Sequence, residues 1–171
     1  MSEDIVGTRV EEVCQAWPEH EASSLEVVLR ILRAYHFLDQ ELVRGLLDYG
    51  VNPGEFGVLV ELRLAGPPYR LTPTQLHNRL LVTSGGVTGR IDKLQRRGLV
   101  CRSPDPEDRR SILVELTERG LEFIEGLSHT HFRIMEHLTE GLTSEERDCL
   151  AGLLKKLVLD LESSCGQWPG R

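Results

Sequence analysis

Aromatic residues are scarce in this chain of 171 residues, at 5% of the total, whereas leucine is abundant. This balance favours helices packed through aliphatic side chains over an aromatic-rich β sandwich. No stretch approaches the roughly 18 apolar residues that a membrane span needs. The acidic N-terminus lacks the apolar core of a signal peptide. We therefore expect a cytoplasmic, mainly α protein with no membrane partner.

Clustered cysteines and catalytic motifs are also missing. The four cysteines stand far apart, at Cys14, Cys101, Cys149 and Cys165. They form neither a disulfide framework nor a zinc-ligand spacing. His129 and His131 are two residues apart and do not share a helix face, which argues against a metal site at that pair. No nucleophile with a base, paired carboxylates or phosphate loop has a catalytic spacing, so we expect no enzyme, metal or cofactor.

The net charge of -7 argues by itself against nucleic-acid binding, but the charge is unevenly distributed. Residues 70–110 hold nine basic and four acidic residues, a local excess of +5, while the rest of the chain carries -12. Attraction to phosphates is decided over a Debye length of about 8 Å, so a basic module on an acidic body remains suited to DNA. The alternative is a basic face that only meets solvent.

The first half of the chain predicts three helices. Apolar residues at helical spacing in residues 1–23 end at Pro18, which indicates a short helix. Ser24 is a candidate N-cap for a long helix up to Gly50, which is apolar on more than one face and so suits a subunit interface. Asn52 and Pro53 carry the start signal of the next helix, up to about residue 64.

A helix-turn-helix and a hairpin are predicted next. Thr72 and Pro73 begin a helix over residues 74–81, and Thr83 or Ser84 caps a second helix that ends at Gly98. Residues 99–102 and 112–116 have strand composition, and the polar residues between them form a hairpin loop, or wing. Thr117 then opens a helix, and a capping box starts the last one. That capping box pairs Thr143 with Glu146.

The second helix of this pair has two different faces. At about 100° per residue, Val87, Ile91 and Leu94 share one side and should pack inward. Gly85, Thr88 and Gly89 fall opposite, and these small residues allow the close approach that a recognition helix makes in the major groove. The alternative is that Gly85 and Gly86 only loosen the helix start.

The hairpin loop ends in a basic tip. Arg109 and Arg110 are expected to reach a minor groove or nearby phosphates, and Asp108 to pair with Arg110 and stiffen the loop. A lone Asp-Arg-Arg is weak evidence, but at hairpin distance from a helix-turn-helix it is strong. The predicted DNA-binding residues are Thr74, Gln75, Ser84, Gly85, Thr88, Gly89, Lys93, Arg109 and Arg110.

These motifs, LTPTQL, TSGGVTGRIDKLQRRGLV and PDPEDRRSILVELT, resemble the winged helix-turn-helix of the MarR family of bacterial transcription regulators, over about residues 24–161. The resemblance implies a homodimer on a pseudo-palindromic operator in double-stranded DNA, and repression relieved by a small ligand or by cysteine oxidation. The implied fold is mainly α with a small β wing. Its parts are an N-terminal extension helix (1–23), a dimerisation helix (24–50), the winged module (51–117), C-terminal dimerisation helices (118–162) and a flexible tail (163–171).

The N-terminal extension is similar to that of a subgroup whose extra helix places a tryptophan over the effector pocket and which responds to urate or similar aromatic anions. Trp17, Arg90 and Arg102 match its ligand-binding pattern, but Gly57 stands where the subgroup usually has an acid. The resemblance thus implies a small aromatic or anionic effector. The alternative for Trp17 is a hydrophobic staple of the extra helix.

The sequence thus predicts a DNA-binding transcription regulator, a repressor released by a small aromatic or anionic ligand. One alternative is a winged-helix module that binds a protein instead of DNA. Another is a redox sensor acting through Cys14, although Glu11 and Glu12 beside it oppose formation of the thiolate.

Overall fold

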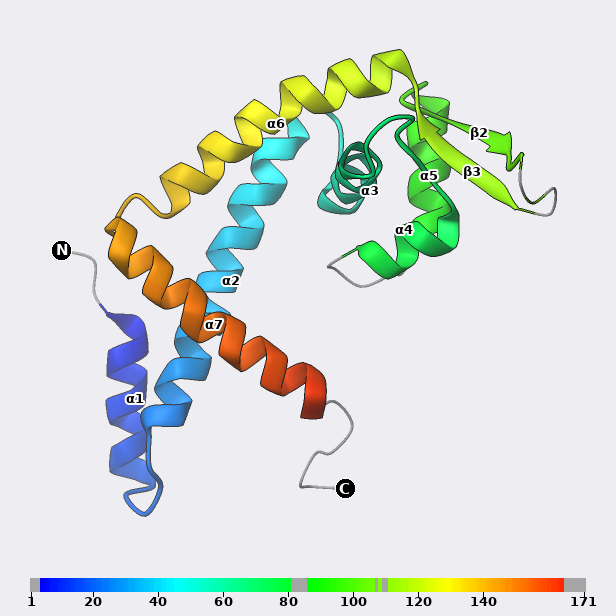
Figure 1. Ribbon diagram of the computed structural model, residues 1–171. Coiled ribbons are helices and arrows are strands. Elements are labelled where there is room, and N and C mark those ends of the chain that lie inside the picture. The colour runs from blue at the N-terminus through cyan, green and yellow to red at the C-terminus, as the bar shows by residue number, and fades with distance from the viewer. Residues whose placement is uncertain (1–3, 81–85, 107, 109–110, 165–171) are drawn as a thin grey trace. The chain divides into compact units, whose positions relative to one another are not determined.

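The computed structural model describes residues 4–80, 86–106, 108 and 111–164, which form seven helices and three short strands (Figure 1). This confirms the predicted fold class, mainly α with a small β wing. The chain divides into two compact units, Met1–Phe132 and Arg133–Arg171. The elements are α1 (Ile5–Ala16), α2 (Ser23–Leu47), α3 (Pro53–Leu64), β1 (Arg70–Leu71), α4 (Pro73–Arg79), α5 (Val87–Arg96), β2 (Val100–Pro104), β3 (Ile112–Leu116), α6 (Glu118–Leu138) and α7 (Ser144–Ser164).

Three helices begin with a capping box. In this motif the side-chain oxygen of the N-cap residue accepts from the backbone amide of the third helical residue, and the side chain of that third residue accepts from the N-cap amide. This satisfies backbone donors that a helix start would leave unpaired. The start signals predicted for α3, α4 and α7 are therefore confirmed. The pairs are Asn52 with Glu55, Thr72 with Gln75, and Thr143 with Glu146.

Some boundaries differ from the predicted ones. Helix α2 begins at Ser23 after an N-cap at Ala22, so the prediction of Ser24 as N-cap is wrong. The hydroxyl of Ser23 bonds the carboxylate of Glu21, outside the helix. The predicted caps Thr83 and Ser84 lie outside the described residues. The described part of α5 begins at Val87, after Gly86 with a φ of 87°.

The sheet contains a strand that the sequence did not reveal. Its order is β1-β3-β2, with antiparallel pairs throughout. The predicted hairpin is confirmed, with Val100 opposite Leu116 and Pro104 opposite Ile112. Strand β1 adds Leu71 opposite Val114. A strand of two residues is too short to show a period-2 pattern in the sequence. Its pairing with β3 places the start of α4 beside the hairpin.

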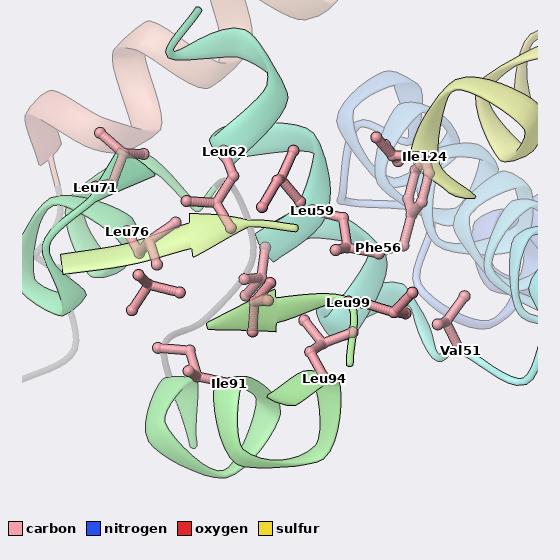
Figure 2. Packing of buried hydrophobic residues seen from close by; sticks show 14 of the residues in the cluster. Val51, Phe56, Leu59, Leu62, Leu71, Leu76, Ile91, Leu94, Leu99 and Ile124 are labelled. Carbon is pink, nitrogen blue, oxygen red and sulfur yellow. The ribbon is translucent and has the colours of Figure 1, made fainter. Parts of the chain in front are cut away.

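The core of the first unit lies where α3, α5 and the sheet meet (Figure 2). Leu59 and Leu62 of α3, Ile91 and Leu94 of α5, and Val114 of β3 have no exposed surface. Complete burial of such a side chain contributes about 1.5–3 kcal/mol. The buried face of α5 is therefore held by α3 and the sheet together.

Helix α1 packs on α2 as a helical hairpin. The Arg30 guanidinium of α2 donates to both Asp4 carboxylate oxygens, at 3.2 and 2.9 Å, while the Gly7 amide donates to Asp4 at 3.1 Å. The bond from Arg30, with that from Gly7, lowers the pKa of Asp4 to about 2. The predicted extension helix is thus present, with Trp17 at its C-cap and 55% exposed.

The second unit contains the end of α6, from Arg133 to Leu138, and helix α7. Leucines along α7, among them Leu153 and Leu161, are exposed in the single chain. No helix in the described part of the chain combines the length and apolar character that crossing a membrane requires.

The first turn of α6 lies against the connection between α5 and β2. A Cβ added at Gly120 would lie 1.9 Å from the carbonyl oxygen of Leu99, whereas one added at Gly126 of the same helix would meet nothing within 4 Å. The Thr117 hydroxyl accepts from the Gly120 amide at 2.9 Å and donates to the Gly98 carbonyl at 2.7 Å. Helix α6 therefore needs glycine at position 120.

Gly120→Ala should lower the free energy of unfolding by about 1–3 kcal/mol, because the backbone at Leu99 must move. Gly126→Ala is the matched control and should raise that free energy by about 0.5–1 kcal/mol through helix propensity alone. Urea unfolding followed by circular dichroism measures both. Equal effects of the two substitutions would contradict the close contact.

Candidate nucleic-acid interface

Helix α5 presents a small, open surface on the side away from the core. Val87, Ile91 and Leu94 are buried, as the helical wheel predicted. Thr88 and Gly89 are exposed on the other side, and a Cβ added at Gly89 would meet nothing within 4 Å. The backbone of α5 can thus approach another surface closely at its N-terminal half, as a recognition helix does in the major groove.

Helix α4 is positioned by its capping box. The Gln75 side-chain oxygen accepts from the Thr72 amide at 2.8 Å, and the Gln75 amide donates to the Thr72 hydroxyl at 3.2 Å. Gln75 thus uses its side-chain oxygen within α4, so its NH2 group is the part that would make the predicted DNA contact. Thr74 is exposed beside it.

Lys93 is drawn toward α3. Its amine lies 3.5 Å from the carboxylate of Glu55, whose side chain is only 7% exposed. The amide of Asn52 also donates to Glu55, at 3.2 Å. Because Lys93 itself is 58% exposed, its amine remains close to solvent. The predicted DNA contact by Lys93 requires this ion pair to open or to be shared.

Arg102 connects the wing to the recognition helix. Its guanidinium donates to the carboxylate of Asp92 at 2.6 Å and to the side-chain oxygen of Gln95. The side chain is 28% exposed. A charge-assisted pair across two elements fixes their relative orientation more firmly than an isolated surface pair would. In this arrangement Arg102 braces β2 against α5.

Arg90 lies on another side of α5. A Cβ added at Gly54 of α3 would lie 2.4 Å from Nε and 2.6 Å from Cζ of Arg90, so the guanidinium packs directly on the first turn of α3. Positions 90 and 92 are about 200° apart on a helix. Arg90 therefore faces α3 while Arg102 contacts the opposite side of α5. The described contacts do not bring the two predicted ligand-binding arginines together.

At the wing, Asp108 interacts with Ser111. The Ser111 hydroxyl donates to the Asp108 carboxylate at 2.9 Å, and the Ser111 amide donates to the Asp108 carbonyl at 2.8 Å. Ser111 was not among the predicted residues. Four of the predicted DNA-binding residues lie outside the described residues, namely Ser84, Gly85, Arg109 and Arg110. The predicted pair of Asp108 with Arg110 therefore also remains a prediction.

Exposed arginines that the predicted set did not include add to the basic surface. Arg70 precedes the capped start of α4, Arg79 ends α4, and Arg96 ends α5. All three were counted in the local charge excess of residues 70–110, which was the sequence signal that could have identified them. Among the described residues, no group of three or more His, Cys, Asp or Glu side chains is placed to hold a metal ion.

Comparisons with known proteins agree with this geometry. Residues 49–111 match the model of the MarR family. The HTH-type transcriptional regulator YkoM of Bacillus subtilis is 39% identical over 124 residues, 72% of this chain and 79% of the relative. The chain belongs to the MarR family of transcription regulators. The winged helix-turn-helix of a DNA-binding regulator is therefore confirmed.

Two solved structures that are similar to this chain are informative. A mutant MarR of Escherichia coli complexed with operator DNA is 30% identical, with a TM-score of 0.69 over 80% of this chain and 96% of that one. BpsR of Bordetella bronchiseptica, whose DNA binding is regulated by 6-hydroxynicotinic acid, is 28% identical, with a TM-score of 0.69 over 81% of this chain and 96% of that one.

The open surface at Gly89 generates a test of the interface. In the series Gly89→Ala, Val and Leu, the fold should stay intact, because each new side chain points into open space. Alanine should raise the free energy of unfolding by about 0.5–1 kcal/mol. DNA affinity should fall with side-chain size, by about tenfold or more for leucine, since close approach to base edges is lost. Fluorescence anisotropy with labelled DNA and urea unfolding measure the two quantities. Unchanged affinity for Gly89→Leu would place the DNA elsewhere.

Proposed function

We propose that this MarR-family protein is a homodimeric repressor that binds a pseudo-palindromic operator and leaves it when a small aromatic or anionic ligand binds. The observation that carries the DNA part is the exposed pair Thr88 and Gly89 on a helix whose opposite face is completely buried. Thr88, and Ser84 by prediction, supply hydroxyl groups to bases or phosphates. Arg109 and Arg110 at the wing are proposed to supply the cations.

A second copy of the chain is proposed because of apolar side chains along α2 and α7. Single exposed apolar residues are ordinary, but rows of them along a helix mark an interaction surface. A dimer would present two recognition helices to half-sites about 34–36 Å apart. The exposed residues are Val27, Val28, Leu32, Tyr35, Phe37 and Leu38 of α2, and Leu150, Leu153, Leu154, Val158, Leu159 and Leu161 of α7.

The operator can be recovered by sequencing the DNA that the purified protein selects from its own genome. Binding to that DNA should weaken steeply with salt, because arginine and lysine contacts release counterions from the phosphates. Arg110→Ala should lose most of the affinity and reduce the salt slope by about 2, because the homodimer loses one phosphate contact from each chain. If the protein binds the selected DNA no more tightly than random DNA at about 0.15 M salt, operator recognition is contradicted.

Two arrangements compete for the proposed effector. The predicted set is Trp17, Arg90 and Arg102, of which Arg90 contacts α3 at Gly54. A separate hollow of about 470 Å³ between α3 and α6 is lined by aromatic, aliphatic and charged side chains, and its Arg63 is paired with its Glu125. Burial lowers the pKa of His131 in this hollow, which favours the neutral ring. The lining residues include Phe56, Arg63, Glu125, His131 and Phe132.

The proposed ligand class is a small aromatic carboxylate. It is supported by Arg90, which packs against Gly54, and by the 6-hydroxynicotinic acid that regulates BpsR. Cys14 is an exposed free thiol on α1, which keeps release by oxidation as the alternative hypothesis.

6-Hydroxynicotinic acid and benzoate are suitable probes of the effector. Either should release DNA and quench tryptophan fluorescence in the unmodified protein. Both effects should weaken about tenfold or more in Arg90→Gln, because a charge-assisted hydrogen bond to the anion is lost. Trp17→Phe should lose the quenching.

Phe132→Ala is the discriminating control, since it alters the α3–α6 hollow and leaves Arg90 unchanged. Quenching that persists in Arg90→Gln and disappears in Phe132→Ala would assign the ligand to the hollow instead.

A further inference from the structure

Arg97, at the C-cap of α5, joins the recognition helix to the end of α2. Its guanidinium donates to the Gly50 carbonyl at 2.5 Å and to the Tyr49 carbonyl at 2.9 Å. These carbonyls follow the last turn of α2, where unpaired carbonyls and the helix dipole favour a cation. The planar guanidinium binds two backbone carbonyls just beyond the end of α2 at once.

The same group also reaches α6. The Arg97 guanidinium carbon lies 5.3 Å from the centre of the Phe123 ring, a cation–π distance. Tyr49 packs edge-on against Phe123, with ring centres 6.4 Å apart, and its hydroxyl bonds the Thr130 hydroxyl at 2.7 Å. Arg97, Tyr49, Phe123 and Thr130 thus form one joint between α5, α2 and α6, all within the first compact unit.

We infer that Arg97 is a positioning residue for operator binding. It sets the orientation of α5 against α2 and α6, and it does not contact DNA itself. This inference rests on the proposed operator function of α5. It also assigns Arg97 a role different from that of its exposed neighbour Arg96, although both add to the basic charge of the module.

Apolar burial alone would hold α5 less precisely. Ile91 and Leu94 fix which face points inward, but contacts between aliphatic side chains are not directional. Two hydrogen bonds from a planar group fix both distance and angle at the C-terminal end of α5. Lysine keeps the charge at this position but offers a single nitrogen, so it cannot reproduce the paired geometry.

The decisive variant is therefore Arg97→Lys, with Arg96→Lys as the matched control on the same helix. Operator affinity should fall about tenfold in Arg97→Lys, because a charge-assisted hydrogen bond is lost. Its affinity for random DNA and its salt slope should stay those of the unmodified protein, since no phosphate contact changes. Arg96→Lys should stay within about twofold on every measure, as surface substitutions do.

Tyr49→Phe tests the joint without changing α5 or its charge. It removes the bond to Thr130 and should weaken operator binding about threefold, the equivalent of one neutral hydrogen bond. The double variant Arg97→Lys/Tyr49→Phe should lose less than the product of the two single effects, because both loosen the same joint. Thermal unfolding of each variant identifies any that fails to fold. If Arg97→Lys does not fold, Tyr49→Phe decides by its ratio of operator to random-DNA affinity.

Three results would overturn the inference. The first is an Arg97→Lys variant that binds the operator as tightly as the unmodified protein. The second is an Arg97→Lys variant whose affinity for random DNA falls together with its salt slope, because this would mean that Arg97 contacts a phosphate. A folded Tyr49→Phe with unchanged operator preference would be equally decisive. If the unmodified protein itself fails to distinguish the operator, the operator function falls and this role of Arg97 falls with it. If the unmodified protein prefers the operator and Arg97→Lys keeps the same preference, only the role of Arg97 is refuted.

Discussion

The burial of one face of α5 is the constraint on which the DNA-binding surface depends. Ile91 and Leu94 have no exposed surface, and they meet α3 and the sheet (Figure 2). A helix rotates by about 100° per residue, so fixing these two positions also fixes which residues face outward. A slip of one residue would bury Thr88 or expose Ile91. Every proposed base contact therefore depends first on hydrophobic packing, which contributes about 1.5–3 kcal/mol for each buried side chain.

Polar contacts then divide the basic residues of the module between two roles. Arg97 and Arg102 are held by protein acceptors, and Lys93 is paired with the buried carboxylate of Glu55. Arg79 and Arg96 are exposed. The count of nine basic residues in positions 70–110 therefore overstates the number of cations available to phosphates, although all nine contribute to the field that attracts DNA. Arginines that orient the recognition helix add charge to the surface without occupying a phosphate site.

Signals confined to a few neighbouring residues were sufficient to predict much of this fold. The N-cap Asn52 with Pro53 in the first turn, and the terminator Gly98 with a φ of 69°, act within one turn, and both are as predicted. Strand β1 was missed because two residues carry no periodicity. The partners of Arg97 and Arg102 were also missed. Gly50 is 47 positions from Arg97, and nothing in the local pattern encodes a contact between separate segments.

The opposed placement of Arg90 and Arg102 constrains how an effector could act. Arg90 packs on α3, whereas Arg102 holds Asp92 on the other side of α5. A helix with its side chains is about 10–12 Å wide, more than a single aromatic acid spans. One small ligand therefore cannot contact both arginines unless one of them leaves its present partner. A ligand bound at Arg90 would instead act on the α3–α5 contact, and its effect would reach the wing through α5 and the Arg102–Asp92 pair.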